Sequence, residues 1–97
     1  MRESALQRAI IDALEREGVY VVNVVVAGRK GTLDLLCCVD GRFLALEVKL
    51  PSVDPTPIQV VEAKRVIAAG GDAFIVTDVK GALEFVRAIR RLGLNGG

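Results

Sequence analysis

The hydrophobic positions of this chain change their spacing from segment to segment, and the spacing predicts the elements. From Glu3 to about Glu17 apolar residues recur every three or four positions, which predicts an amphipathic helix that ends at Gly18. The run from Val19 to Ala27 is almost continuously β-branched, which predicts a strand. Because both faces of this strand would be apolar, we expect it to lie inside a covered sheet.

A hairpin is predicted at Asp40-Gly41, which separates two strand-forming runs at 32–39 and 42–49. Counting outward from this turn gives the pairs Val39 with Arg42, Cys38 with Phe43, Cys37 with Leu44, Leu36 with Ala45, Leu35 with Leu46, Asp34 with Glu47, and Thr32 with Lys49. Side chains alternate between the two faces of a strand. One face is therefore predicted to carry Thr32, Asp34, Glu47 and Lys49, and the other Leu33, Leu35, Leu44, Leu46 and Val48.

The second half of the chain is predicted to contain two helices and one strand. The segment 51–57 holds three prolines and cannot continue a strand. Thr56-Pro57-Ile58-Gln59 has the signature of a capped helix start, and this helix is expected to end at Gly70-Gly71. A buried strand at 73–77 follows, and Asp78 is placed to cap a last helix from Val79 to about Leu92. The order αβββαβα, with apolar character on both faces of the central strands, predicts an α/β fold: a three-layer sandwich in which a mixed β-sheet is flanked by helices.

Composition narrows the class of protein. The 97 residues predict a single domain over 1–97, and 52% hydrophobic with 26% charged residues is typical of a globular fold. No apolar run approaches the ~20 residues that span a membrane, so we expect no membrane partner. The N-terminal sequence does not resemble a signal peptide. We therefore expect an intracellular protein, in the cytoplasm or, if it is viral, in the cytoplasm of the host cell.

The residue types that are missing exclude several chemistries. The chain has no histidine, and its two cysteines, Cys37 and Cys38, are adjacent in a predicted strand, so a zinc site and a His-activated nucleophile are both disfavoured. Oxygen ligands remain for a metal. The net charge of +1 is weak for a nucleic-acid-binding protein, although Arg29-Lys30 and the group Arg87, Arg90 and Arg91 could form local basic surfaces. The four aromatic residues fall mostly in the expected core, so we do not expect bases to stack on them.

Asp34 and Glu47 are the strongest candidates for a chemical site. Opposed residues of a hairpin have Cβ atoms about 4.5–5.5 Å apart, so the two carboxylates would repel each other unless a cation lies between them. Both could reach a Mg²⁺ ion, which binds oxygen at about 2.0–2.1 Å. Lys49 on the same face would orient a water molecule and stabilise charge on a phosphoryl group. The alternative is a solvated polar edge without a function.

These residues also carry a family resemblance. Gly31-Thr32-Leu33-Asp34 followed by Glu47-Val48-Lys49 resembles the motif of the PD-(D/E)XK nuclease superfamily. The segments 55–59 and Ala68-Ala69-Gly70-Gly71 extend this match. Nearly the whole chain therefore resembles the virus-type replication-repair nuclease family, VRR-NUC. The resemblance implies a restriction-endonuclease-like core and a metal-dependent DNA nuclease that uses Mg²⁺ or Mn²⁺. Leu33 stands where the superfamily has its proline, a departure that leaves every charged group in place.

The resemblance also implies roles for single residues. Asp34 and Glu47 would be metal ligands, the carbonyl of Val48 a third, and Lys49 the catalytic lysine. Glu3 matches the first-helix acid of the family and is a further candidate ligand. An exposed glutamate favoured by the helix dipole is the alternative for Glu3.

Two more groups of residues are candidates on weaker grounds. Gln59 matches a second-helix glutamine beside the active site, but it is equally the expected partner of Thr56 in a capping box. Arg29 and Lys30 precede the motif in a glycine-bounded loop and are candidate contacts to a DNA backbone. A solvated basic loop is about as good an explanation for them.

The sequence therefore predicts a metal-dependent endonuclease that acts on duplex or branched DNA, such as junctions or flaps, without a small-molecule cofactor. Because so small a domain offers little surface to hold DNA, we expect a homodimer. A phage, plasmid or repair setting fits equally well. The rival hypothesis is a catalytically inactive nuclease-fold module for DNA binding or assembly, which the low net charge supports. A small α/β protein with an acidic pair at a strand edge is the third possibility.

Overall fold

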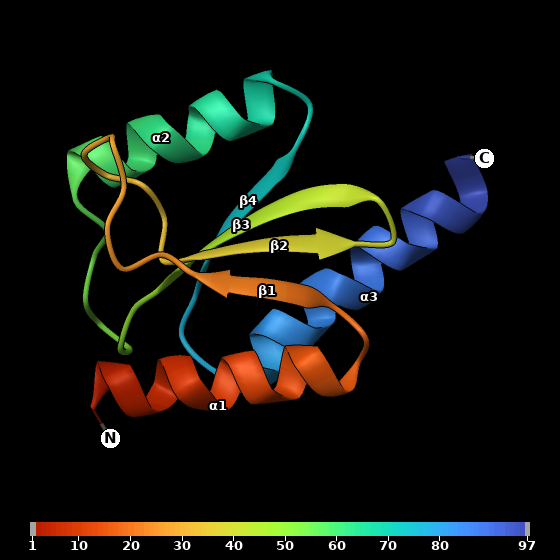
Figure 1. Cartoon of the computed structure of the whole chain (residues 1–97), viewed down its shortest axis with the longest axis horizontal. Helices are drawn as coiled ribbons and strands as arrows, with labels where there is room; N and C mark the ends of the chain where they lie inside the picture. Colours follow the sequence, from red (N-terminus) through yellow and green to blue (C-terminus); the bar gives the residue numbers. More distant parts are fainter. Residues whose placement is uncertain (1, 97) are drawn as a thin grey trace.

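The computed structural model describes residues 2–96, which form three helices and one sheet (Figure 1). The elements are α1 (Glu3–Arg16), β1 (Tyr20–Asn23), β2 (Leu35–Val39), β3 (Arg42–Val48), α2 (Pro57–Ala68), β4 (Asp72–Val76) and α3 (Val79–Gly96). The strands lie in the order β1-β2-β3-β4, antiparallel from β1 to β3 and parallel between β3 and β4. Helices α1 and α3 cover one face of the sheet, and α2 packs on the other. The predicted three-layer α/β sandwich with a mixed sheet is confirmed.

The hairpin between β2 and β3 has the predicted register. Its pairs run from Val39 with Arg42 to Leu35 with Leu46. Asp40 and Gly41 have φ angles of 49° and 87°, the left-handed conformation that a two-residue turn of this kind requires. The register places Ala45 and Glu47 on the face towards α2, and Leu44, Leu46 and Val48 in the larger core towards α1 and α3.

Leu33 lies on the opposite face from the one predicted. It belongs to the small core beneath α2, with Ala45 and Ala73, rather than to the larger core that contains Leu35. The regular strand begins only at Leu35. Because residues 32–34 lie outside the strand, the alternation of faces cannot be extended to them.

The prediction that 19–27 forms a covered strand is wrong. Only Tyr20–Asn23 form a strand, and β1 lies at the edge of the sheet. Tyr20 is 69% exposed, and Val25 and Val26 in the following loop are 84% and 89% exposed. Helix α2 packs on β3 and β4, so it leaves the same face of β1 uncovered. Val19 and Val21 belong to or pack on the core of the opposite face, so only part of the apolar character of this segment reflects burial within the chain.

The last helix is longer than predicted, because α3 continues beyond Leu92 to Gly96. The aromatic residues were expected to lie mostly in the core, but Tyr20 and Phe43 are 69% and 46% exposed. Among the described residues, no helix combines the length and the apolar character that a membrane crossing needs.

Candidate active site

Three predicted site residues meet where β2 begins and β3 ends. Glu47 is the penultimate residue of β3 and is 1% exposed, although it carries an ionisable group. Asp34 immediately precedes β2 and is partly buried. Lys49 directly follows β3, and its side chain is 12% exposed. The hairpin therefore brings two acids and one ammonium group to the same end of the sheet.

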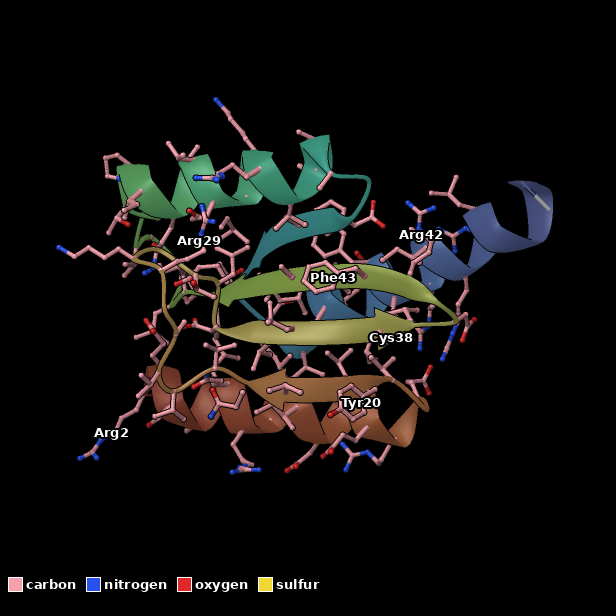
Figure 2. The ribbon with its side chains drawn as sticks, turned by 45° about the horizontal axis from the view of Figure 1, so that its top comes forward. Arg2, Tyr20, Arg29, Cys38, Arg42 and Phe43 are labelled. Carbon is pink, nitrogen blue, oxygen red and sulfur yellow. The ribbon has the colours of Figure 1, made fainter. Side chains whose placement is uncertain are left out.

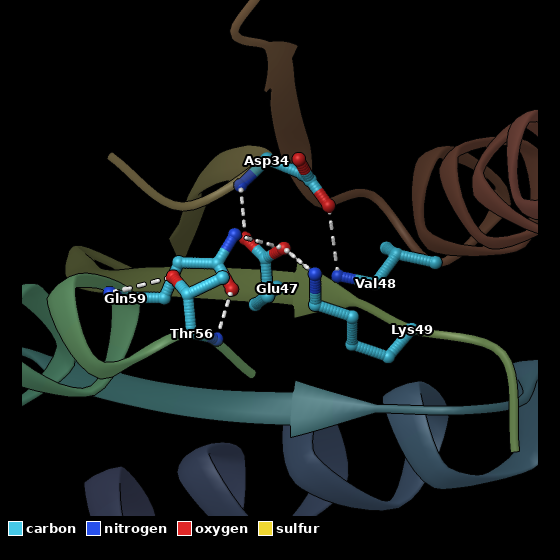
Figure 3. Close-up of polar contacts among 6 residues, drawn as sticks. All are labelled: Asp34, Glu47, Val48, Lys49, Thr56 and Gln59. Carbon is cyan, nitrogen blue, oxygen red and sulfur yellow. Dashed lines mark hydrogen bonds and ion pairs between the residues drawn. The ribbon is translucent and has the colours of Figure 1, made fainter. Parts of the chain in front are cut away.

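The two acids are held in place by each other's backbone. The Asp34 backbone N–H donates to Glu47 Oε1 at 3.3 Å, and the Val48 N–H donates to Asp34 Oδ2 at 3.0 Å (Figure 3). Each carboxylate thus accepts a hydrogen bond from the backbone of the segment that carries the other. This reciprocal pair orients both acids towards the same space, as the predicted register requires.

Gln59 joins this cluster from α2, where it has two roles at once. Its side-chain oxygen accepts from the Thr56 N–H at 2.9 Å, and its own N–H donates to Thr56 Oγ1 at 3.3 Å, which completes the capping box. Its side-chain Nε2 donates to Glu47 Oε2 at 2.8 Å. The two explanations considered for Gln59 are therefore compatible, because the amide oxygen caps the helix while the amide nitrogen binds the acid.

Glu47 has an unusual protonation equilibrium. Burial, followed by the negative charge of Asp34, raises the pKa of Glu47 from 4.5 to about 7. Lys49 opposes this shift, since its Nζ lies 3.3 Å from Glu47 Oε2. Near neutral pH the metal-free site therefore holds an acid that is only partly ionised. A cation beside both carboxylates would favour the ionised form.

The donor set fits a divalent cation that prefers oxygen. Within residues 2–96 no group of three or more Asp, Glu, His or Cys side chains is arranged to hold a metal. Mg²⁺ is commonly bound by one or two carboxylates and completes its shell with water. The backbone N–H of Val48 points to Asp34, and in a strand the N–H and C=O of one residue point to the same side. Asp34, Glu47 and the Val48 carbonyl are thus compatible with such a site.

Glu3 does not join the acid pair in the structure. It is exposed in the first turn of α1, and its proposed role as a ligand stays a prediction. One turn later Gln7 Nε2 donates to Asn23 Oδ1 at 3.1 Å, and the Val24 N–H donates to the backbone oxygen of Asp34 at 2.8 Å. Sequence analysis did not single out Gln7 or Asn23. The only available signal was the four-residue spacing between Glu3 and Gln7, which places them on one helical face.

The basic loop before Asp34 is anchored to α2. Arg29 forms an ion pair with Glu62 at 3.0 Å, and Thr32 Oγ1 donates to the Arg29 carbonyl at 3.0 Å. Gly31 has a φ of +77°, and a Cβ there would lie 2.8 Å from the Ile58 side chain. The close approach of the loop to α2 therefore requires glycine at this position. Arg29 and Lys30 are both exposed beside the helix that carries Gln59.

Arg90, one of the C-terminal basic residues, has a structural role. Its guanidinium group donates to the Glu17 carbonyl at 2.6 Å and to Asp40 Oδ2 at 3.2 Å. These bonds tie α3 to the end of α1 and to the hairpin turn. The guanidinium group is therefore occupied within the chain.

Known proteins resemble this chain in sequence and in structure. No family model matches it. A curated relative named "Putative nuclease p44", from Acyrthosiphon pisum secondary endosymbiont phage 1, is 27% identical over 77 residues, which span 78% of this chain and 83% of the relative. A solved structure described as a VRR_NUC domain superimposes with a TM-score of 0.75 at 28% identity. That superposition covers 88% of this chain and 94% of the other.

Proposed function

We propose that this chain is a VRR-NUC-type, metal-dependent DNA endonuclease that hydrolyses phosphodiester bonds in duplex or branched DNA, because its fold superimposes on a VRR_NUC domain and its sequence resembles a relative named as a putative nuclease. The observation that carries this proposal is the pair Asp34 and Glu47, held facing each other with Lys49 at 3.3 Å from Glu47. Holding the buried carboxylate of Glu47 beside a second carboxylate costs stability, and a bound cation would remove that cost. The relative named as a nuclease supports the same reaction class.

The residues that would hold Mg²⁺ or Mn²⁺ are Asp34 and Glu47 through their carboxylates and Val48 through its carbonyl. When bound, the cation would neutralise charge on a phosphate oxygen and lower the pKa of a bound water molecule. Glu47 must be ionised to take part, and the Gln59 amide helps by donating to its Oε2. Gln59 is therefore a positioning residue, since it acts through Glu47.

The ammonium group of Lys49 places a positive charge beside the acid pair. Its side chain is largely buried against the acid pair, so the ammonium group has little freedom to move away. An ammonium in a partly desolvated site stabilises negative charge that develops on a phosphoryl oxygen more strongly than it would in water. The N–H groups of Lys49 can also donate hydrogen bonds that orient an attacking water molecule.

DNA would approach over the loop that leads to Asp34. Arg29 and Lys30 are exposed there and fit contacts to phosphates, which position DNA without reading its sequence. Their number is small and the net charge is only +1, so a single copy would bind weakly. This is the reason to propose a homodimer, because two copies would double both the contacts and the acid pairs offered to the DNA.

The proposed function is tested by incubating the protein with labelled linear duplex, flap and four-way-junction DNA in Mg²⁺ or Mn²⁺. Cleavage is expected with either ion and is expected to stop in EDTA. Binding is measured in parallel in Ca²⁺ by mobility shift. Binding to every substrate without cleavage of any would instead support a catalytically inactive nuclease-fold module.

The double role of Gln59 gives a separate prediction. Gln59→Ala removes the side-chain oxygen that accepts from the Thr56 N–H and also removes the hydrogen bond to Glu47, whereas Thr56→Ala removes only the hydroxyl that caps the helix. Both should lower the free energy of unfolding by about 0.5–2 kcal/mol. Only Gln59→Ala should also weaken Mn²⁺ binding, by about 10-fold or more, as expected when a group that orients a ligand is lost. Calorimetric titration of Mn²⁺ checks this. Equal Mn²⁺ affinities in the two variants would contradict it.

A further inference from the structure

Helix α2 leaves part of one sheet face open, and this part is apolar. Two rows of paired residues cross β1, β2 and β3: Tyr20, Cys38 and Phe43 in one row, and Val22, Leu36 and Ala45 in the other. Ala45 is buried beneath α2, but Tyr20, Phe43 and Val22 are 69%, 46% and 39% exposed. Cys38 between the two rings is also exposed. Figure 2 shows the first row lying across the sheet beside α2. We call Tyr20, Val22, Cys38 and Phe43 the open face.

The open face has the size of an interface core. An aromatic side chain has about 150–250 Å² of surface, so Tyr20 and Phe43 together expose roughly 200 Å². Val22 and Cys38 add to this area. A standard interface buries about 800 Å² per partner, of which roughly 500 Å² is apolar. The open face would therefore supply much of the apolar centre of such an interface.

The charges around the open face favour a protein partner over DNA. Arg42 pairs with Asp72 at 3.0 Å, and Arg29 pairs with Glu62 at 3.0 Å, with Arg65 at 3.8 Å from the same carboxylate. Three arginines against two acids leave this border with only a small excess of positive charge, whereas a surface that binds the nucleic-acid backbone by itself presents a larger one. A border that carries both signs can also face a copy of itself without net repulsion.

This surface has a groove on one side and an exposed aromatic ring on the other. A groove of about 500 Å³ lies between α2 and β3 beside Phe43, and it is lined by Arg29, Phe43, Glu62, Arg65, Val66, Ala69 and Gly71. Tyr20 projects from the opposite side of the open face, on the edge strand β1. In a two-fold contact each copy presents the same surface to the other. A two-fold axis near Cys38, on the strand between Tyr20 and Phe43, would place the Tyr20 ring of each copy against the groove of the other.

We propose that the open face is the interface of a homodimer of this chain, with its two-fold axis near Cys38 and with Tyr20 of each copy docked beside Phe43 of the other. This inference rests on the homodimer of the proposed function and assigns it a surface. Glu47 lies on the same sheet face as Phe43, four residues further along β3. The two acid pairs would then flank the interface and could reach two strands of one DNA molecule.

The first test is the oligomeric state of the protein without DNA or metal, measured by sedimentation equilibrium. The wild type is expected to be a dimer at micromolar concentration. Tyr20→Glu and Phe43→Glu should each weaken dimerisation by about 100-fold, because a charge would be buried at the centre of the contact. Leu92→Glu is the matched control, since Leu92 is 57% exposed on α3 away from the open face, and it should not change the dimer. Thermal melts establish that each variant is folded.

The second test uses the native cysteine of the open face. A short bismaleimide should link two copies through Cys38, because Cys37 is buried and burial raises its thiol pKa to about 12. The linked dimer should be absent in Cys38→Ser and reduced in Tyr20→Glu. A monomeric wild type, or a dimer that survives both face variants, would overturn the proposal. A monomer that still cleaves DNA would overturn only this inference, and a dimer that never cleaves DNA would overturn only the proposed function.

Discussion

Lys49→Ala is expected to lower the rate of DNA cleavage by about 10²–10³-fold, the usual effect of removing one group that stabilises transition-state charge. DNA binding in Ca²⁺ should change little, because Lys49 is largely buried and offers little surface to the DNA backbone. Single-turnover cleavage in Mn²⁺ measures the effect. Lys64→Ala removes the same charge from an exposed position on α2 and should cleave at the wild-type rate.

The loss of cleavage rate in Lys49→Ala could have two causes, and the dependence of the rate on pH distinguishes them. Lys49 also holds down the pKa of Glu47, so its removal would leave Glu47 more protonated at neutral pH. If this were the whole effect, cleavage would recover as the pH is raised to about 9. If Lys49 acts on the phosphoryl group, the loss persists at every pH. Wild-type activity in Lys49→Ala at neutral pH would remove Lys49 from the mechanism altogether.

The second large effect concerns the stability of the metal-free protein as a function of pH. The pKa of Glu47 rises from 4.5 to about 7 on folding, so between these values the folded chain binds more protons than the unfolded chain. The contribution of Glu47 to the free energy of unfolding is therefore highest below about pH 4.5 and falls as the pH rises to about 7. The whole change is on the order of 3 kcal/mol. Glu47→Gln should abolish this decrease, because glutamine does not ionise.

Urea unfolding in EDTA at several pH values measures this decrease. The comparison is between slopes with pH, because Glu47→Gln also removes the charge that pairs with Lys49 and so changes the absolute stability. Glu84→Gln is the control, since Glu84 is exposed on α3 and should keep the wild-type slope. At pH 8 Mn²⁺ should raise the melting temperature of the wild type and leave that of Glu47→Gln nearly unchanged. A wild-type slope in Glu47→Gln would contradict the prediction.

Much of the candidate site was predictable because its central residues lie on one hairpin. The turn at Asp40-Gly41 leaves a single register, and that register brings Asp34 to Glu47 and places Lys49 beside them. For Gln59 the sequence left two roles open, a helix cap or a residue beside the active site. The structure shows that it makes both contacts, because the start of α2 lies against the end of β3.

The errors have a common physical origin. The apolar run around β1 was expected to be buried, yet Tyr20 and Val22 are exposed, since α2 packs on β3 and β4. Leu33 was assigned by a strand period that does not reach it. In both cases the burial of a residue was inferred from the spacing of its neighbours in the sequence. Burial depends instead on which distant segment packs on that residue.

The order of the elements, the hairpin register and the meeting of Asp34 with Glu47 could be inferred from the amino-acid sequence, because they follow from turn chemistry and from periods within short segments. Three other features became clear only from the folded chain: β1 lies at the edge, Gln59 reaches Glu47, and Tyr20 and Phe43 share an open apolar face. The placement of a helix over a sheet depends on packing between segments that are far apart in the chain. Periodicity within one segment carries no information about that packing.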